Sequence, residues 1–386
     1  MNSVLFNTHD IALLITIYVC LLFAFFLLIL KKGNTRSNRF LALFLFCYAA
    51  IPVDTLINFG EAFRQYTIDL SANLFYIFGS AYWLESVFLL FYVRSLIYKN
   101  FRFKKTDILY LIPFLLYLIY EANNFYFLDY ESKLSILNGY HLESEPGYTF
   151  ALNLFRECFR TFCGVLCLVE LRRYQAQIKN QFADIEEIDL TWLKVLVVGF
   201  LIIHILAILV TVGYISTIEL SLYINYRALG LISNYAVLFL ISFLIFFSLN
   251  YSTVFKGIAK ENSKSIDKAD VNLEQVAAIT KYMEEQKPFL NHLLTLDNLA
   301  KQLHLPARNL SQVINRHFKC NFFEFINGYR IAESKRLLLA QKNRKTTMLE
   351  IMDNSGFNSK ATFNTFFKKI VGKTPTQFRK DNIESL

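Results

Sequence analysis

The first 250 residues contain seven apolar stretches whose length suits a membrane-crossing helix, which needs about 20 predominantly apolar residues. They lie at about 11–30, 40–59, 71–93, 107–127, 150–171, 191–213 and 228–249. The stretch at 107–127 is the least regular because Pro113, Glu121 and Asn123 interrupt it, and without it both chain ends would lie on one side. The pattern predicts an all-α fold in which residues 1–250 form a seven-helix transmembrane bundle.

The basic residues of the connecting loops predict how these spans are oriented, because Lys and Arg resist transfer across a membrane. The first, third and fifth loops together carry 12 such residues, whereas the alternate loops carry 3. The odd-numbered loops are therefore expected in the cytoplasm and the N-terminus outside. Seven spans then place the chain from residue 251 onward in the cytoplasm.

Five ionisable side chains fall within the predicted spans, where a charge is costly and usually faces the bundle interior. They are Asp54, Glu85, Arg156, Arg160 and His204. One interpretation is a pocket for a signal molecule. The other is structural: the arginines pair with Glu85, Asp54 or Glu157 to hold the bundle together, and His204 is satisfied in the interior. The acidic, aromatic loop at 121–149 is open to two interpretations as well, a lid or recognition surface and a solvated connection.

The remaining third of the chain is polar and basic. Residues 251–386 hold 22 Lys and Arg against 13 Asp and Glu, whereas residues 1–250 hold 18 of each, so all of the +9 net charge lies in the C-terminal part. Such an excess is expected where a chain binds nucleic acid or an anionic membrane surface. Residues 251–278 begin with a polar run and continue at helical spacing, which predicts a cytoplasmic linker and a helix that couples or caps the next domain.

Two short helices joined by a tight turn are predicted between Thr295 and Phe318. Thr295 suits a helix start, and apolar residues then recur on one face. After the turn His304-Leu305-Pro306, the second helix presents the polar side chains of Arg308, Ser311, Gln312, Asn315 and Arg316. Side chains of these types bond base edges and phosphates, as a recognition helix in the major groove requires. The pattern is typical of a helix-turn-helix.

A long amphipathic helix is predicted from Phe322 to about Ala340, and a second pair of short helices follows it. The turn of this pair contains Gly356, which suits a left-handed backbone conformation. Asn358 or Ser359 can cap the helix that follows.

Several residues of this region form the pattern of a known family. They are Tyr329-Arg330-Ile331, Lys335-Arg336-Leu337-Leu338, Gly356-Phe357, Phe363, Phe367-Lys368-Lys369, Gly372, Pro375 and Arg379. Over residues 279–382 the chain resembles the DNA-binding domain of AraC-type regulators. The resemblance implies two helix-turn-helix units held by the long central helix, each placing one helix in successive major-groove segments of DNA. With its spans, the chain is similar to seven-span bacterial regulators, which implies the inner membrane as its location.

The resemblance also assigns roles position by position. It places base-facing roles on Arg308, Ser311 and Gln312 in the first unit and on Lys360, Ala361 and Thr365 in the second. Lys368, Lys369 and Arg379 take phosphate-side or packing positions, and Asn364 completes the predicted interface. The chain departs from the family at Met352, where a small alanine is usual. Ala361 is a poor base reader, so the second unit is expected to add more affinity than sequence information.

These features predict a membrane-bound, one-component sensor that changes its binding to promoters when an external or membrane signal shifts the bundle. The expected partners are double-stranded DNA, the lipid bilayer, RNA polymerase, a second copy of the chain and an unidentified external ligand. The alternatives are a regulator whose spans only anchor it and a regulator coupled to a transporter. The sequence has no phosphate-binding, hydrolase, zinc-protease or histidine-kinase motif, and its cysteines lack metal-site spacing. No enzyme activity, cofactor or metal is therefore expected.

Overall fold

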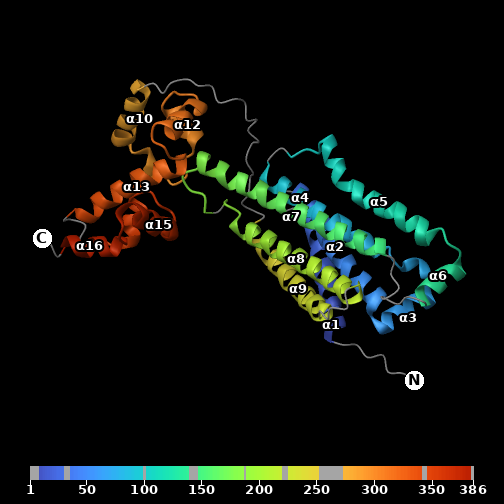
Figure 1. Ribbon diagram of the computed structural model, residues 1–386. Helices are drawn as coiled ribbons and strands as arrows, with labels where there is room; N and C mark the ends of the chain where they lie inside the picture. Colours follow the sequence, from blue (N-terminus) through green and yellow to red (C-terminus); the bar gives the residue numbers. More distant parts are fainter. Residues whose placement is uncertain are drawn as a thin grey trace. The chain divides into compact units, whose positions relative to one another are not determined.

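The computed structural model describes residues 8–29, 35–98, 101–138, 147–186, 188–219, 225–251, 273–340 and 346–383. Within these ranges the chain is helical and forms no β-strand, which confirms the all-α prediction. It divides into two compact units (Figure 1). Unit 1 comprises Met1–Arg172 and Thr191–Lys260, and unit 2 comprises Arg173–Leu190 and Glu261–Leu386.

Unit 1 is a bundle of long apolar helices. Its elements are α1 (Thr8–Ile29), α2 (Thr35–Phe59), α3 (Glu61–Leu70), η1 (Ala72–Leu74), η2 (Phe78–Ser80), α4 (Ala81–Ile97), η3 (Lys105–Leu111), α5 (Ile112–Glu121), the π-helix η4 (Ala122–Tyr126), α6 (Tyr130–Asn138), α7 (Gly147–Gln181), α8 (Thr191–Glu219) and α9 (Tyr226–Tyr251). Helix α1 packs against α2 and α9, α2 packs against α4, and α8 packs against α9. The interior is aromatic, with Phe44, Tyr48 and Phe200 in mutual ring contact.

Six helical stretches of the described chain are long and apolar enough to cross a membrane. They are Thr8–Ile29, Thr35–Phe59, Ala72–Ile97, Lys105–Tyr126, Thr191–Thr217 and Ala228–Phe247. Each corresponds to one of the seven predicted spans. The span predicted at 150–171 differs because it lies within α7, where arginine and glutamate side chains lower the hydropathy. By length and composition, the described chain therefore supports six of the seven spans.

The segment that follows the fourth candidate span is folded against its neighbours. Arg64 of α3 donates to the carbonyl of Leu137 at 2.6 Å. Lys133 of α6 donates to Asn73 Oδ1 at 3.0 Å and to the carbonyl of Tyr126 at 2.9 Å. These bonds fix parts of residues 122–138 to neighbouring elements, although many side chains of the segment are exposed. Residues 139–146 of the acidic, aromatic loop expected at 121–149 lie outside the described residues.

Unit 2 contains the predicted pairs of short helices. Its elements are the last turns of α7, then α10 (Leu273–Gln286), η6 (Pro288–Leu290), α11 (Leu296–Gln302), α12 (Ala307–Arg316), α13 (Phe322–Leu339), α14 (Met348–Asn354), α15 (Lys360–Val371) and α16 (Pro375–Ile383). Figure 1 shows α13 running between α10 and α12 on one side and α15 and α16 on the other. The predicted linker residues 252–272 lie outside the described residues, and the predicted coupling helix is α10.

Local side-chain bonds begin three short helices of unit 2, two of them at positions that the sequence analysis proposes. Thr295 accepts from the amide of Asn298, and Ser359 accepts from the amide of Thr362. Thr347 forms a capping box with Glu350. Each cap satisfies a backbone amide that the helix leaves unpaired. These bonds explain why the boundaries of the short helices were predictable.

Helix α13 joins two hydrophobic cores. The first core contains Phe322, Phe325 and Ile326 of α13 together with residues of α10, α11 and α12. The second contains Phe323, Ile331 and Leu338 of α13 together with residues of α14 and α15, including the unusual Met352. Met352 is buried there, so the larger side chain is accommodated by the packing around α14.

Gly356 is expected to be the least replaceable glycine of unit 2. Its φ is +87°, and a Cβ at this position would lie 2.5 Å from the carbonyl oxygen of Phe289. Gly356→Ala should therefore destabilise unit 2 by about 3 kcal/mol or more, since strain and a backbone clash add. Amide hydrogen exchange of α13 and α15 in the full chain measures the loss.

Gly328→Ala is the matched control for this prediction. Nothing lies within 4 Å of an added Cβ at Gly328, and alanine is the better helix former by up to about 1 kcal/mol. Protection should stay unchanged or rise. Equal exchange rates in the Gly356→Ala and Gly328→Ala variants would contradict the assigned turn geometry.

Candidate DNA-binding interface

Helix α12 has one face in the first core and one face in contact with solvent. Leu310, Val313 and Ile314 are buried. The predicted DNA-contacting side chains lie on the remainder of the helix: Arg308 and Asn315 are exposed, and Ser311, Gln312 and Arg316 are half-buried. The Asn315 side-chain amide lies 3.3 Å from Ser311 Oγ, to which it donates. The structure thus brings the five residues together on one short helix.

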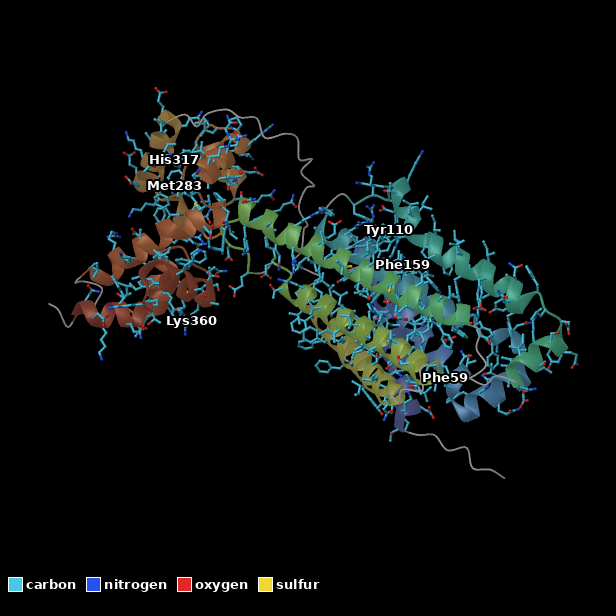
Figure 2. All side chains as sticks on the ribbon, in the orientation of Figure 1. Phe59, Tyr110, Phe159, Met283, His317 and Lys360 are labelled. Atoms are coloured by element: carbon cyan, nitrogen blue, oxygen red, sulfur yellow. The ribbon has the colours of Figure 1, made fainter. Side chains whose placement is uncertain are left out.

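Helix α15 repeats this division in the second core. Phe363, Phe366 and Phe367 are buried. The six predicted interface residues of this helix are all exposed: Lys360, Ala361, Asn364, Thr365, Lys368 and Lys369. Figure 2 marks Lys360, the first residue of α15. The exposed face combines amide, hydroxyl and ammonium groups, which suit base edges and phosphates.

Lys369 has a protein partner in the structure. Its Nζ donates to Glu324 Oε1 at 2.9 Å, which links α15 to the first turn of α13. This hydrogen bond is the main reason that the pKa of Glu324 is lowered. The ion pair is largely exposed, and such pairs contribute little stability. A phosphate can therefore compete with Glu324 for Lys369 at small cost.

Arg379 of α16 is half-buried, and burial lowers its pKa below the ordinary value. Its Nε and Nη2 atoms are buried and have no hydrogen-bond partner among the described residues. The side chain packs within unit 2, in line with the packing alternative for this position.

Arg330 of α13 has a role that the sequence did not reveal. Its guanidinium is buried and donates to the carbonyls of Phe289, Ala183 and Asn291 at 2.8, 3.0 and 3.1 Å. It also donates to Asn327 Oδ1 at 3.3 Å. Burial lowers the pKa of Arg330 to about 10, and the negative charge of Asp184 opposes that shift. The family pattern marked this residue, but its partners are distant in sequence.

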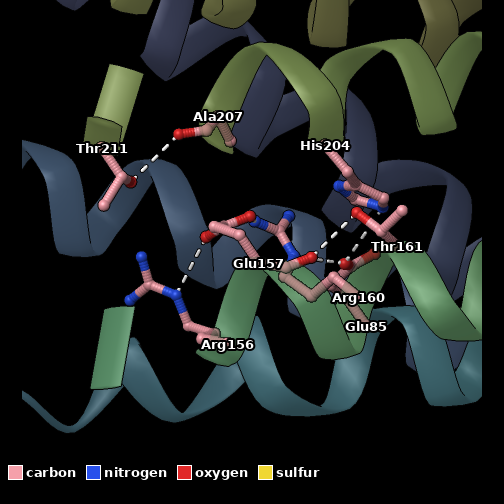
Figure 3. Close-up of polar contacts among 8 residues, drawn as sticks. All are labelled: Glu85, Arg156, Glu157, Arg160, Thr161, His204, Ala207 and Thr211. Carbon is pink, nitrogen blue, oxygen red and sulfur yellow. Dashed lines mark hydrogen bonds and ion pairs between the residues drawn. The ribbon is translucent and has the colours of Figure 1, made fainter. Parts of the chain in front are cut away.

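Four of the five predicted intramembrane residues meet in unit 1 (Figure 3). Arg160 Nε lies 2.7 Å from Glu85 Oε1, and Arg160 Nη1 lies 2.7 Å from Glu157 Oε2. Arg156 Nε lies 3.0 Å from Glu157 Oε1, and His204 Nε2 lies 3.6 Å from Glu85 Oε1. These contacts match the structural alternative, in which arginine and glutamate side chains hold the bundle together.

Asp54 contacts other groups. A Cβ at Gly79 would lie 3.5 Å from Asp54 Oδ1 and 2.8 Å from the Tyr117 hydroxyl, so both side chains line the space beside Gly79. Arg156 lies over the ring of Tyr82, with 4.4 Å between its guanidinium carbon and the ring centroid. The described residues contain no cluster of three or more side chains suited to a metal.

Comparison with known proteins supports the DNA-binding assignment of unit 2. A family model described as a helix-turn-helix domain matches residues 299–381, about a fifth of the chain. The match begins within α11 and extends through α15 to most of α16. It confirms the predicted AraC-type helix-turn-helix domain.

Two curated regulators are similar to this chain. The Msm operon regulatory protein of Streptococcus mutans is 29% identical over 121 residues, which cover 31% of this chain and 40% of that protein. The probable transcription factor PqrA of Proteus vulgaris is 27% identical over 103 residues, which cover 27% of this chain and 81% of that protein. The chain thus spans less than half of the first relative. No solved structure matches it.

Arg160 is expected to be the most sensitive residue of this charged cluster. Arg160→Met leaves the buried carboxylates of Glu85 and Glu157 without this partner, and a broken buried pair typically costs about 3–5 kcal/mol. Arg156→Met is the matched control, since Arg156 is more exposed and pairs with Glu157 alone in this cluster. Thermal unfolding of the full chain in detergent should show a clearly larger loss for Arg160→Met. Similar losses would contradict a central role for Arg160.

Proposed function

We propose that the chain is a membrane-bound, sequence-specific DNA-binding transcription regulator that couples an external or membrane signal to gene expression. The observation that carries the proposal is the AraC-type helix-turn-helix domain, in which α12 and α15 each direct a polar face to solvent from a core shared with α13. Two such helices on one rigid support can enter successive major-groove segments. The regulator names of both relatives support the same function.

The proposed base-contacting residues are Arg308, Ser311 and Gln312 on α12, with Asn315 and Arg316 beside them. On α15, Lys360 and Thr365 are proposed base contacts, Ala361 and Asn364 lie at the interface, and Lys368 and Lys369 contact phosphates. Arginine pairs with guanine and glutamine with adenine through two hydrogen bonds each. Arg308 and Gln312 therefore carry most of the proposed sequence choice.

Membrane attachment is proposed from the apolar helices of unit 1. If α7 crosses the membrane in addition to the six candidate spans, the chain has seven spans. The distribution of loop charges then favours an outside N-terminus and a cytoplasmic unit 2, where promoter DNA is accessible. The proposed location is the bacterial inner membrane. RNA polymerase and a second copy of the chain are the proposed protein partners.

Sensing is proposed to involve the intramembrane residues Asp54, Glu85, Arg156, Arg160 and His204. A bundle held by buried ion pairs has discrete arrangements, and a ligand that favours one of them shifts the population. The alternatives are that the spans only anchor the regulator or that a transporter controls it. Replacing the seven spans with an unrelated set separates these cases, because a mere anchor would leave the response unchanged. No catalytic role is assigned.

The Arg308→Ala, Gln312→Ala double variant tests base recognition. The full chain in lipid nanodiscs is first used to select a preferred duplex from a random pool. Each lost bidentate base contact should cost about 1–3 kcal/mol of discrimination, while salt-dependent binding to unrelated DNA persists. Lys281→Ala is the control, because Lys281 is exposed on α10 outside the proposed interface. Unchanged sequence preference in the double variant would refute the assigned contacts.

Cysteine labelling tests the orientation. Cys158 and Cys320, the native cysteines that are not buried, are first replaced by serine. Exposed Glu131 and Arg102 are then changed to cysteine one at a time. A membrane-impermeant maleimide should label Glu131→Cys in intact cells and Arg102→Cys only after permeabilisation. The reverse pattern would show that the orientation is inverted.

A further inference from the structure

The part of the chain between α7 and α8 folds into the DNA-binding unit. By sequence this region is a loop between two predicted spans, yet residues 173–190 belong to unit 2. Helix α7 continues to Gln181, about ten residues past the end of the predicted span. Tyr174 donates to the carbonyl of Ile188 at 2.5 Å, and Gln175 donates to that of Asp189 at 2.9 Å, so the segment is braced internally.

Residues 182–185, here called the bridging segment, enter the first core. Phe182 forms an isolated antiparallel bridge with Thr295, the residue that caps α11. The amide of Ala183 donates to the carbonyl of Leu294 at 3.1 Å. The Ala183 side chain is fully buried among residues of the first core. A charged side chain at this position would be buried among apolar groups, which is costly.

The same segment reaches the second core two residues later. Ile185 packs against the cluster that contains Phe363 and Phe367 of α15. In the preceding helix, the positive charge of Lys179 contributes to the lowered pKa of Glu324, the residue that binds Lys369 of α15. The bridging segment therefore contacts both cores directly.

Arg330 lies where these parts meet. Its partners are the carbonyls of Phe289 and Asn291, which precede α11, and the carbonyl of Ala183 in the bridging segment. Its guanidinium also lies 5.6 Å from the ring centroid of Phe357, in the turn of the second helix pair. Loss of one carbonyl would leave a buried donor unpaired, which is costly. The bridging segment is thus part of the junction between the two helix pairs.

Two recognition helices bind one DNA duplex tightly only if their separation and orientation match its groove spacing. We propose that the bridging segment is a positioning element that sets the mutual orientation of α12 and α15. This inference rests on the proposed DNA-binding function.

The alternative is that the segment only stabilises unit 2. The two cases predict different affinities for a DNA duplex that carries only one of the two recognition segments. Global destabilisation weakens binding to any duplex, whereas lost orientation weakens binding only where both helices must engage at once. A duplex that offers one recognition segment is therefore the decisive probe.

The test uses the full chain in nanodiscs and the duplex that the wild-type chain selects from a random pool. Footprinting defines its two segments, and scrambling either one yields a half-site duplex. The variants are Ala183→Arg, which introduces a charge into the first core, and the double change Ala183→Arg with Ile185→Asp, which adds a charge at the second core. Glu186→Ala is the control, since Glu186 is exposed next to the segment. A second control inserts a flexible Gly/Ser stretch of about 20 residues after Ser265.

Both segment variants should bind the complete duplex about tenfold or more weakly, a typical size for coupling between sites. Binding to each half-site duplex should match that of the wild-type chain, and both controls should behave as wild type. The amide at position 183, which bonds to Leu294 in the wild-type chain, should exchange faster. Protection of α12 and α15 should persist.

Three results would overturn the inference: unchanged affinity for the complete duplex, parallel losses for complete and half-site duplexes, or continued protection at position 183 in both variants. The last result would show that the described contacts do not hold the segment. A wild-type chain that selects no duplex would instead contradict the proposed function. Failure of the two proposals is thus distinguishable.

Discussion

The organisation of the DNA-binding unit depends on the burial of one guanidinium group. Arg330 is almost completely buried, and its planar fork is matched by three backbone carbonyls. A buried charge is tolerated only when its donors are paired, so the turn before α11, the chain at Ala183 and helix α13 must all be in place together. Pairing of Arg330 therefore links the two hydrophobic cores at a second place, in addition to their connection through α13.

The need to pair buried charges also explains how α7 fits into the bundle of unit 1. Helix α7 is too charged to qualify as a span by composition, but Arg160 is buried between Glu85 and Glu157. The charges are compensated within unit 1 rather than exposed to an apolar surrounding. In its last turns the helix is polar and enters unit 2, where it leads into Phe182 and Ala183. Residues of α7 therefore belong to both units.

The sequence-based predictions were accurate where the interacting residues are close together in the sequence. Thr295, Thr347 and Ser359 cap helices through bonds to residues three positions away, so a short window of sequence contains the whole interaction. The buried faces of α12 and α15 likewise follow from helical periodicity. The sequence left several possible partners for Arg160, because pairing across helices depends on how the helices pack. The docking of Ala183 was missed, since nothing near it in sequence indicates Leu294.

The sequence by itself determined the all-helical class, the candidate spans, the basic character of the C-terminal third and the two helix pairs of the AraC-type domain. These features depend on composition, periodicity and local caps, which act within a few turns of chain. Only the tertiary structure decided which buried charges pair and that residues 182–185 contact both cores. Arg330 and Ala183 are 147 positions apart, and Arg160 and Glu85 are 75 positions apart. The energy of these contacts comes from burial and hydrogen-bond geometry that exist only once the chain is packed.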